Sequence, residues 1–252
     1  MLHLDPRPGA LADNRALIER SVRLAAARGA KFILTPELVE SGYHFPDYIG
    51  TGWVGVNSRT WLDRMATLAG DLEVTLLLAT AERDESHGDL YNTVFALTGE
   101  GKIAGKYRKI NIHHSHTAES WADVGDSAEI IVLPEFKIGV LICADAWRPS
   151  LAGELAAKGA ELIISAANWG ETPCPPDSCW EQRSLETGVP VWVCNRTGAE
   201  HDLNFEDAAS IVAVAGRRLL SHVGPGSVIL FFDWDIEKKT PLQTEFEVVS
   251  VF

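Results

Sequence analysis

The chain has 252 residues, of which 46% are hydrophobic and 23% charged, so its composition is that of a globular protein and excludes extensive disorder. The net charge of −13 argues against a nucleic-acid partner or an anionic membrane surface. No apolar run approaches the roughly 20 residues that span a bilayer. The first residues also lack the basic and apolar regions of a signal peptide. We therefore expect a cytoplasmic protein with no membrane partner.

The first third of the chain predicts alternating strands and helices. A short strand over 2–4 is followed by a helix that Asp13 caps and Gly29 ends. A buried strand over 31–35 follows, and Glu37 comes directly after it. A second helix opens at Asn57 or Ser58, closes at Gly70, and precedes an apolar strand over 74–80.

The rest of the chain continues this pattern. Glycines 99 and 101 predict a hairpin between two strands. Helices are predicted from Pro149 through Lys158 and from Ser178 to Gly188. The further predicted strands cover 91–98, 102–109, 130–133, 136–142, 162–166, 190–194, 208–214, 217–221, 228–232 and 246–251. No linker interrupts the alternation, so we expect a single α/β domain over residues 1–252, built on a mixed sheet or on two sheets.

Cys143 stands where an apolar, β-branched strand stops abruptly. The predicted helix behind it would direct free backbone N–H groups and its positive end to this point. Such surroundings favour a thiolate, the form that attacks carbon. A small apolar cysteine filling a strand end is the alternative. The other cysteines are Cys174, Cys179 and Cys194, which we interpret as structural thiols, since the spacing of the first two fits neither a redox pair nor a zinc knuckle.

Two further groups could complete a nucleophilic site. Glu37 follows its strand as a possible general base, and Lys109 ends a basic run as a cation that could stabilise a thiolate or an oxyanion. The parallel strand ends would bring these residues to one edge. A serine-hydrolase elbow and a phosphate-binding glycine loop are both missing from the sequence.

Three histidines occur within His113–His116. Neighbouring positions on one loop do not present a tetrahedral set of ligands, and no fourth ligand is evident, so we expect no metal there. A loop covering the site is the preferred interpretation, and a Cys–His pair with Cys143 stays open.

These stretches together resemble the nitrilase superfamily, the carbon–nitrogen hydrolases. The matching segments follow the family's order over almost the entire chain: Thr35-Pro36-Glu37 with Ser41-Gly42-Tyr43, Tyr91-Asn92-Thr93, Gly105 to Lys109, Gly125-Asp126, Ile138 to Asp145, Asn168-Trp169, and Asn195 to Gly198. The resemblance implies a four-layer αββα sandwich, usually dimeric, that needs no cofactor or metal.

By the same resemblance, Cys143 is the nucleophile, Glu37 the general base and Lys109 the catalytic lysine. Glu119 matches a second family glutamate by order, although its spacing to Gly125 is about one residue short. The backbone N–H of Ala144 would share the oxyanion hole with the lysine. Tyr43, Trp147, Asn168 and Trp169 are the further residues expected beside the substrate.

The resemblance favours an amidase over a true nitrilase, because Cys143-Ala144-Asp145 differs from the Cys-Trp-Glu pattern of nitrilases. Expected is hydrolysis of a small amide or N-carbamoyl compound through a cysteine thioester. The alternatives are nitrile hydrolysis, acyl transfer and a non-catalytic binding module on the same fold. Ala144, Arg148-Pro149-Ser150 and Ala213 to Gly216 depart from the family pattern and leave the substrate open.

Overall fold

Two β-sheets form the centre of the molecule, which is a computed structural model describing residues 1–112, 118–170 and 178–252. The larger sheet has the order β13-β12-β9-β8-β7-β6, and β7, β8 and β9 run parallel. Its strands are β6 (Ile131–Val132), β7 (Lys137–Ile142), β8 (Leu162–Ala167), β9 (Val191–Asn195), β12 (Ser210–Val214) and β13 (Arg217–His222).

The second sheet has the order β2-β3-β4-β5, with β2 and β3 parallel. Its strands are β2 (Phe32–Leu34), β3 (Thr75–Arg83), β4 (Leu90–Leu97) and β5 (Ile103–Arg108). Smaller sheets are formed by β1 (Leu2–His3), β14 (Val228–Phe231) and β17 (Glu247–Ser250), by β10 (Ala199–Glu200) and β11 (Leu203–Asn204), and by β15 (Trp234–Asp235) and β16 (Thr240–Pro241).

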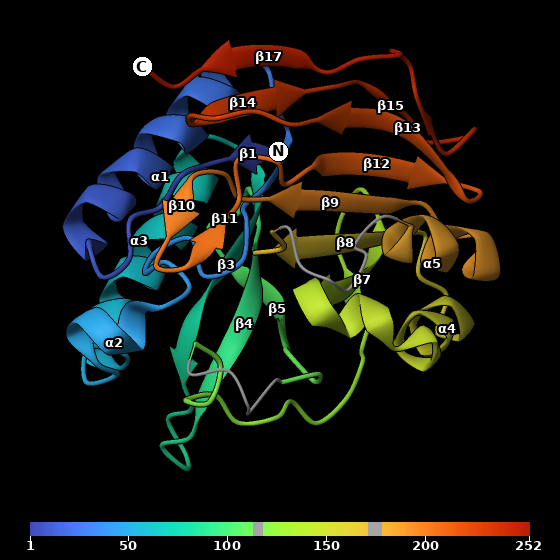
Figure 1. Cartoon of the computed structure of the whole chain (residues 1–252). Coiled ribbons are helices and arrows are strands. Elements are labelled where there is room, and N and C mark those ends of the chain that lie inside the picture. Colours follow the sequence, from blue (N-terminus) through green and yellow to red (C-terminus); the bar gives the residue numbers. More distant parts are fainter. Residues whose placement is uncertain (113–117, 171–177) are drawn as a thin grey trace.

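Helices cover the outer faces of the two central sheets, so the predicted αββα sandwich is the observed architecture. Figure 1 shows α1 (Leu11–Ala27) and α3 (Val56–Asp71) on one side, with the short α2 (Phe45–Ile49) below them. On the opposite side lie α4 (Pro149–Ala157) and α5 (Cys179–Thr187).

Strand β3 shows why the sequence specifies two buried faces. Leu77 and Ala79 pack into the cluster between the two sheets, whereas Leu76 and Leu78 pack into the cluster under α1 and α3. Successive side chains of a strand point to opposite faces, so a strand covered on both sides must be apolar throughout. The continuous apolar run of β3 is therefore the signature of the layered fold.

Some predicted element boundaries were wrong. Helix α1 begins at Leu11, and Asp13 lies in its first turn, paired with Arg7, instead of capping it. Ser58 is the third residue of α3, where its hydroxyl accepts a hydrogen bond from the N–H of Gly55 at 2.9 Å. The Asp13 carboxylate and the Ser58 hydroxyl each stabilise the start of their helix, but they do so from inside its first turn and not from the capping position before it.

Nothing in the sequence pattern had indicated α2 or the β10–β11 hairpin. Both are too short to carry a periodic signal. None of the described helices is both long and apolar enough to cross a membrane.

Candidate active site

Cys143 lies at a sharp turn at the carboxyl end of β7. Its φ angle of +48° is in the left-handed region, which a residue with a side chain rarely adopts. A 3₁₀-helix over Cys143–Trp147 follows, and α4 begins at Pro149, where the sequence predicted a helix start. The turn leaves Cys143 on the wall of a cavity.

The carboxylate of Asp145 holds this turn together. One oxygen accepts hydrogen bonds from the N–H of Ile142 and the hydroxyl of Tyr107, both at 2.9 Å. The other accepts from the backbone N–H groups of Asn111 at 2.7 Å and Ile110 at 3.3 Å. A fully buried carboxylate thus ties the cysteine turn to the segment that follows Lys109. The sequence analysis assigned no role to Asp145.

Lys109 bridges two carboxylates at the end of β5. Its Nζ donates to Oε1 of Glu37 at 2.8 Å and to Oε1 of Glu119. Glu37 Oε1 also accepts a hydrogen bond from Asn92 Nδ2 at 2.7 Å. The side chains of Lys109 and Glu37 are fully buried. Lys109 therefore has a fixed position and cannot turn away to water.

Gly125 supports this arrangement from behind. Its N–H donates to the carbonyl of Lys109 at 2.8 Å. A Cβ atom at this position would lie 2.2 Å from the carbonyl oxygen of Arg108. Only glycine permits so close an approach, which gives the Gly125-Asp126 motif a structural reason.

The charges of the cluster favour proton transfer. Burial raises the pKa of Glu37, and Lys109 offsets this rise only in part. Burial would by itself lower the pKa of Lys109, but Glu37 and Glu119 raise it well above the ordinary value. Two carboxylates face one ammonium, so the cluster can accept a proton and lose a buried negative charge.

The expectation of a resting thiolate at Cys143 was wrong. Burial raises the pKa of the thiol well above its ordinary value, and the charge of Glu37 raises it further against the opposing effect of Lys109. The resting group is therefore a thiol, so a nearby base must take its proton before it can attack.

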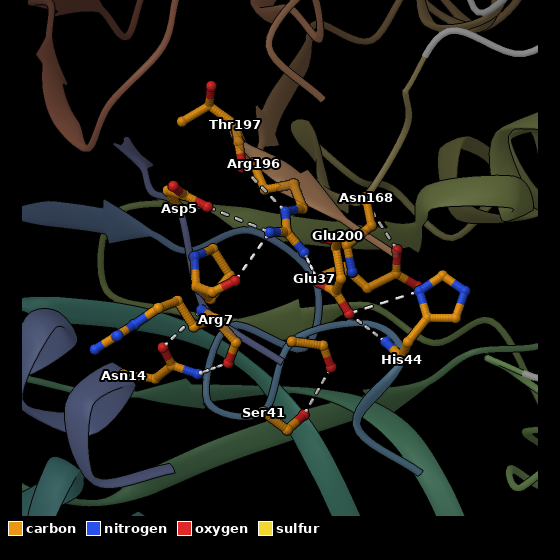
Figure 2. Close-up of polar contacts among 12 residues, drawn as sticks. Asp5, Arg7, Asn14, Glu37, Ser41, His44, Asn168, Arg196, Thr197 and Glu200 are labelled. Atoms are coloured by element: carbon orange, nitrogen blue, oxygen red, sulfur yellow. Dashed lines mark hydrogen bonds and ion pairs between the residues drawn. The ribbon is translucent and has the colours of Figure 1, made fainter. Parts of the chain in front are cut away.

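The segment after β8 meets the same cluster. The N–H of Asn168 donates to Glu37 Oε2 at 3.0 Å, a contact drawn in Figure 2. Asn195 clamps the next residue, because it accepts from the N–H of Trp169 and donates to the carbonyl of Trp169, both at 3.0 Å. The ends of β8 and β9 thus position the glutamate opposite Cys143.

A cavity of about 280 Å³ opens over these groups. It is lined by seven residues predicted from the sequence, namely Tyr43, Glu119, Cys143, Ala144, Trp147, Asn168 and Trp169. Glu37 and Lys109 lie buried behind this lining. The side-chain amide of Asn168 is buried and has no hydrogen-bond partner among the residues that the structure describes. An unpaired buried amide beside a cavity is available to a bound molecule.

Another part of the cavity wall consists of residues that the sequence did not predict as site residues. His44 lies directly before α2. The other residues lie in or near the β10–β11 hairpin or just after β8: His201, Asp202, Leu203, Phe205 and Gly170. The His113–His116 segment and Cys174, for which roles had been weighed, lie outside the described residues. Buried Cys194 donates to the carbonyls of Leu2 and Leu34 at 3.2 and 3.3 Å, which is a structural position.

Comparison with known proteins identifies the class. The family model described as carbon-nitrogen hydrolase matches residues 2–229, so the chain belongs to the carbon–nitrogen hydrolase family, as its motifs predicted. The fold is also confirmed: the amidase from Nesterenkonia sp. AN1 superposes with a TM-score of 0.80 at 23% identity, covering 90% of this chain and 89% of that one.

Two curated relatives show the range of names within the family. An N-carbamoylputrescine amidase of Arabidopsis thaliana is 32% identical over 95% of this chain and 84% of the relative. A nitrilase of Pyrococcus abyssi is 31% identical over 82% of this chain and 78% of the relative.

Proposed function

We propose that the protein hydrolyses a small amide or N-carbamoyl compound to a carboxylic or carbamic acid and ammonia or an amine. The observation that carries this proposal is the fixed cluster of Glu37, Lys109 and Glu119 beside the Cys143 turn. Relatives named amidases support the same reaction class. The pattern at Cys143-Ala144-Asp145 favours an amide over a nitrile.

The reaction begins with proton transfer. Glu37 accepts the proton of the Cys143 thiol as sulfur attacks the carbonyl carbon, which forms a C–S bond and a tetrahedral oxyanion. The Lys109 ammonium and the Ala144 N–H stabilise the oxyanion. Glu37 then gives the proton to the departing nitrogen, the C–N bond breaks and a thioester remains.

Water completes the cycle. Glu37 takes a proton from a water molecule, the oxygen attacks the thioester carbonyl, and the C–S bond breaks as the proton returns to sulfur. The raised pKa of Glu37 suits a group that must both accept and deliver a proton near neutral pH. Asn168, with its free amide, would contact the polar atoms of the acyl group.

The test is ammonia release from a panel of small amides, N-carbamoyl compounds and nitriles, compared between wild type and Cys143→Ala. Release from amides or N-carbamoyl compounds that disappears in the variant is the expected result. Release from nitriles alone would favour the nitrilase alternative suggested by the relative from Pyrococcus abyssi. No release, together with a Cys143 thiol inert to iodoacetamide, would favour a binding module.

A further inference from the structure

One side of the cavity is a wall that performs no step of the proposed reaction. We call it the hairpin wall and define it by His44, His201, Asp202, Leu203 and Phe205. It lines the same cavity as Cys143, so a substrate tail that extends from the scissile bond into this part of the cavity contacts it. Its charges therefore bear on which acyl groups the enzyme accepts.

The cavity has a one-sided charge. Among the lining residues that the structure describes, Glu119 and Asp202 are acidic, and there is no lysine or arginine. The segments 113–117 and 171–177, which lie outside the described residues, contain neither lysine nor arginine in their sequence. A substrate carboxylate would therefore lose water without gaining a basic partner from these side chains.

Lys109 and Arg196, two buried cations near the cavity, are already committed. Lys109 is held by Glu37 and Glu119. Arg196 lies behind the wall, where Figure 2 shows its guanidinium directed at Asp5 and Glu200. Its Nη2 also donates to the carbonyl of Pro6 at 2.9 Å. Its Nε donates to the carbonyl of Thr197 at 3.1 Å. The Arg196 guanidinium also stacks 4.6 Å over the ring of Phe205. Neither cation is available to a substrate anion without breaking a buried pair.

The same network fixes the wall in place. Glu200 accepts a hydrogen bond from the backbone N–H of His44, and its Oε1 lies 3.6 Å from Nδ1 of that ring. The imidazole stacks on His201 with ring centroids 5.1 Å apart. The hydrogen bonds from His44 and the charge of Arg196 outweigh burial and lower the pKa of Glu200. A buried carboxylate that is paired with Arg196 thus stands behind the imidazole and holds the wall in place.

The remaining lining suits a cation. The Asp202 carboxylate is largely exposed, and one of its oxygens lies 3.6 Å from Nδ1 of His201. Trp147 and Trp169 lie edge-to-face with centroids 5.0 Å apart and contribute indole surface to the same cavity. Indole faces and a carboxylate together are the surroundings that a protonated amine prefers.

Resting on the proposed function, we propose that the hairpin wall selects substrates whose acyl or N-carbamoyl tail ends in a protonated amine and rejects tails that end in a carboxylate. Asp202 supplies the attraction, and the buried pair with Glu200 withholds the Arg196 guanidinium from a substrate anion. Substrates with neutral tails fall between the two.

The experiment uses tails matched in length. Hexanamide is compared with its ω-amino and ω-carboxy derivatives, and butylurea with its own ω-amino and ω-carboxy derivatives. For wild type we expect kcat/KM for the ω-amino member to exceed that for the ω-carboxy member by about tenfold or more at low salt, with the gap shrinking at high salt. Equal values or a preference for the carboxylate would overturn the proposal.

A substitution locates the effect. Asp202→Asn should reduce the ratio of kcat/KM for ω-amino over neutral substrate by about threefold, the size expected of an exposed charge. Asp207→Asn is the matched control, because Asp207 is an exposed aspartate close in sequence that does not line the cavity. An equal fall in both variants, or no fall in Asp202→Asn, would remove Asp202 from the proposal.

Binding separates this proposal from the proposed function. Dissociation constants of the same six compounds are measured by calorimetry with Cys143→Ala, which does not depend on turnover. Tighter binding of the ω-amino members without hydrolysis by wild type would support the selectivity and contradict the proposed chemistry. Hydrolysis that depends on Cys143 but ignores the tail charge would support the chemistry and contradict the selectivity.

Discussion

At the scale of single residues, Glu37 influences Cys143 in two opposite ways. Its negative charge raises the pKa of the thiol and so opposes thiolate formation. As the proposed base it also removes the thiol proton and delivers a proton to the leaving nitrogen. A substitution that keeps the size of the side chain but removes its charge separates these two effects.

Glu37→Gln should therefore react more readily with iodoacetamide yet hydrolyse amides poorly. Removing the charge lowers the thiol pKa, so the midpoint of the alkylation-rate curve moves to lower pH. The loss of proton transfer should lower kcat/KM by about a hundredfold or more. Both quantities can be measured on one preparation, by alkylation followed with mass spectrometry and by ammonia release.

Glu40→Gln is the control for this prediction. Glu40 is also buried and its pKa is also raised by burial, but it binds Arg15 and Thr80 and does not line the cavity. Its substitution should leave the alkylation midpoint in place. Rapid thioester formation in Glu37→Gln would contradict the role of Glu37 as the base.

Asp145 joins the Cys143 turn to the segment around Lys109, so a substitution there should affect both parts of the site. In Asp145→Asn the amide nitrogen would face N–H donors whichever way the side chain turns, so at least one donor loses its partner. We expect a loss of about 1–3 kcal/mol in the free energy of unfolding for each buried donor left unpaired. The kcat should fall more than KM changes, because the Cys143 turn moves relative to Lys109.

Tyr107→Phe provides the comparison, since it removes only one of the four hydrogen bonds to Asp145. Its cost should be about 1 kcal/mol, with a smaller effect on kcat. Denaturant unfolding and steady-state kinetics test both variants. A fully active and stable Asp145→Asn protein would show that the turn does not depend on this carboxylate.

At the scale of elements, the site depends on how closely two backbone segments approach. Gly125→Ala would place a methyl group against the carbonyl of Arg108 at the end of β5. The displaced strand end would shift Lys109, which directly follows it. We expect a marked loss of kcat with a measurable loss of stability. Gly153→Ala is the control: it lies exposed in α4, where a methyl group meets nothing within 4 Å.

The control should behave in the opposite way. Alanine is favoured over glycine inside a helix by about 1 kcal/mol, so Gly153→Ala should raise the melting temperature and keep wild-type activity. Wild-type kinetics in Gly125→Ala would mean that β5 tolerates the displacement and that Lys109 is held by its carboxylate partners alone.

Element ends also explain what the sequence could predict. Cys143 directly follows β7, Lys109 directly follows β5, and Glu37 comes shortly after β2, so a pattern of strand ends indicated all three. The hairpin that carries His201 and Asp202 has strands of two residues, which leave no periodic signal. The protonation of Cys143 was misjudged because it depends on burial and on Glu37, which is distant in sequence.

At the scale of the whole molecule, family resemblance predicts a homodimer. In a two-fold interface, both copies of the chain contribute the same surface patch. On α5, the apolar side chain of Leu185 is 65% exposed, which makes this helix our candidate for the interface. We therefore predict that light scattering at micromolar concentration gives a mass of about twice 27.5 kDa.

Leu185→Asp tests which face pairs. Two like charges would meet across the two-fold axis in a surface that loses water, so the mass should fall towards that of a single chain. Leu242→Asp is the matched control, because Leu242 is equally exposed at 65% but follows β16 and belongs to neither α4 nor α5. A single-chain mass for wild type would contradict the dimer. If the dimer persists in Leu185→Asp but dissociates in Leu242→Asp, the interface lies at the segment after β16 and not at α5.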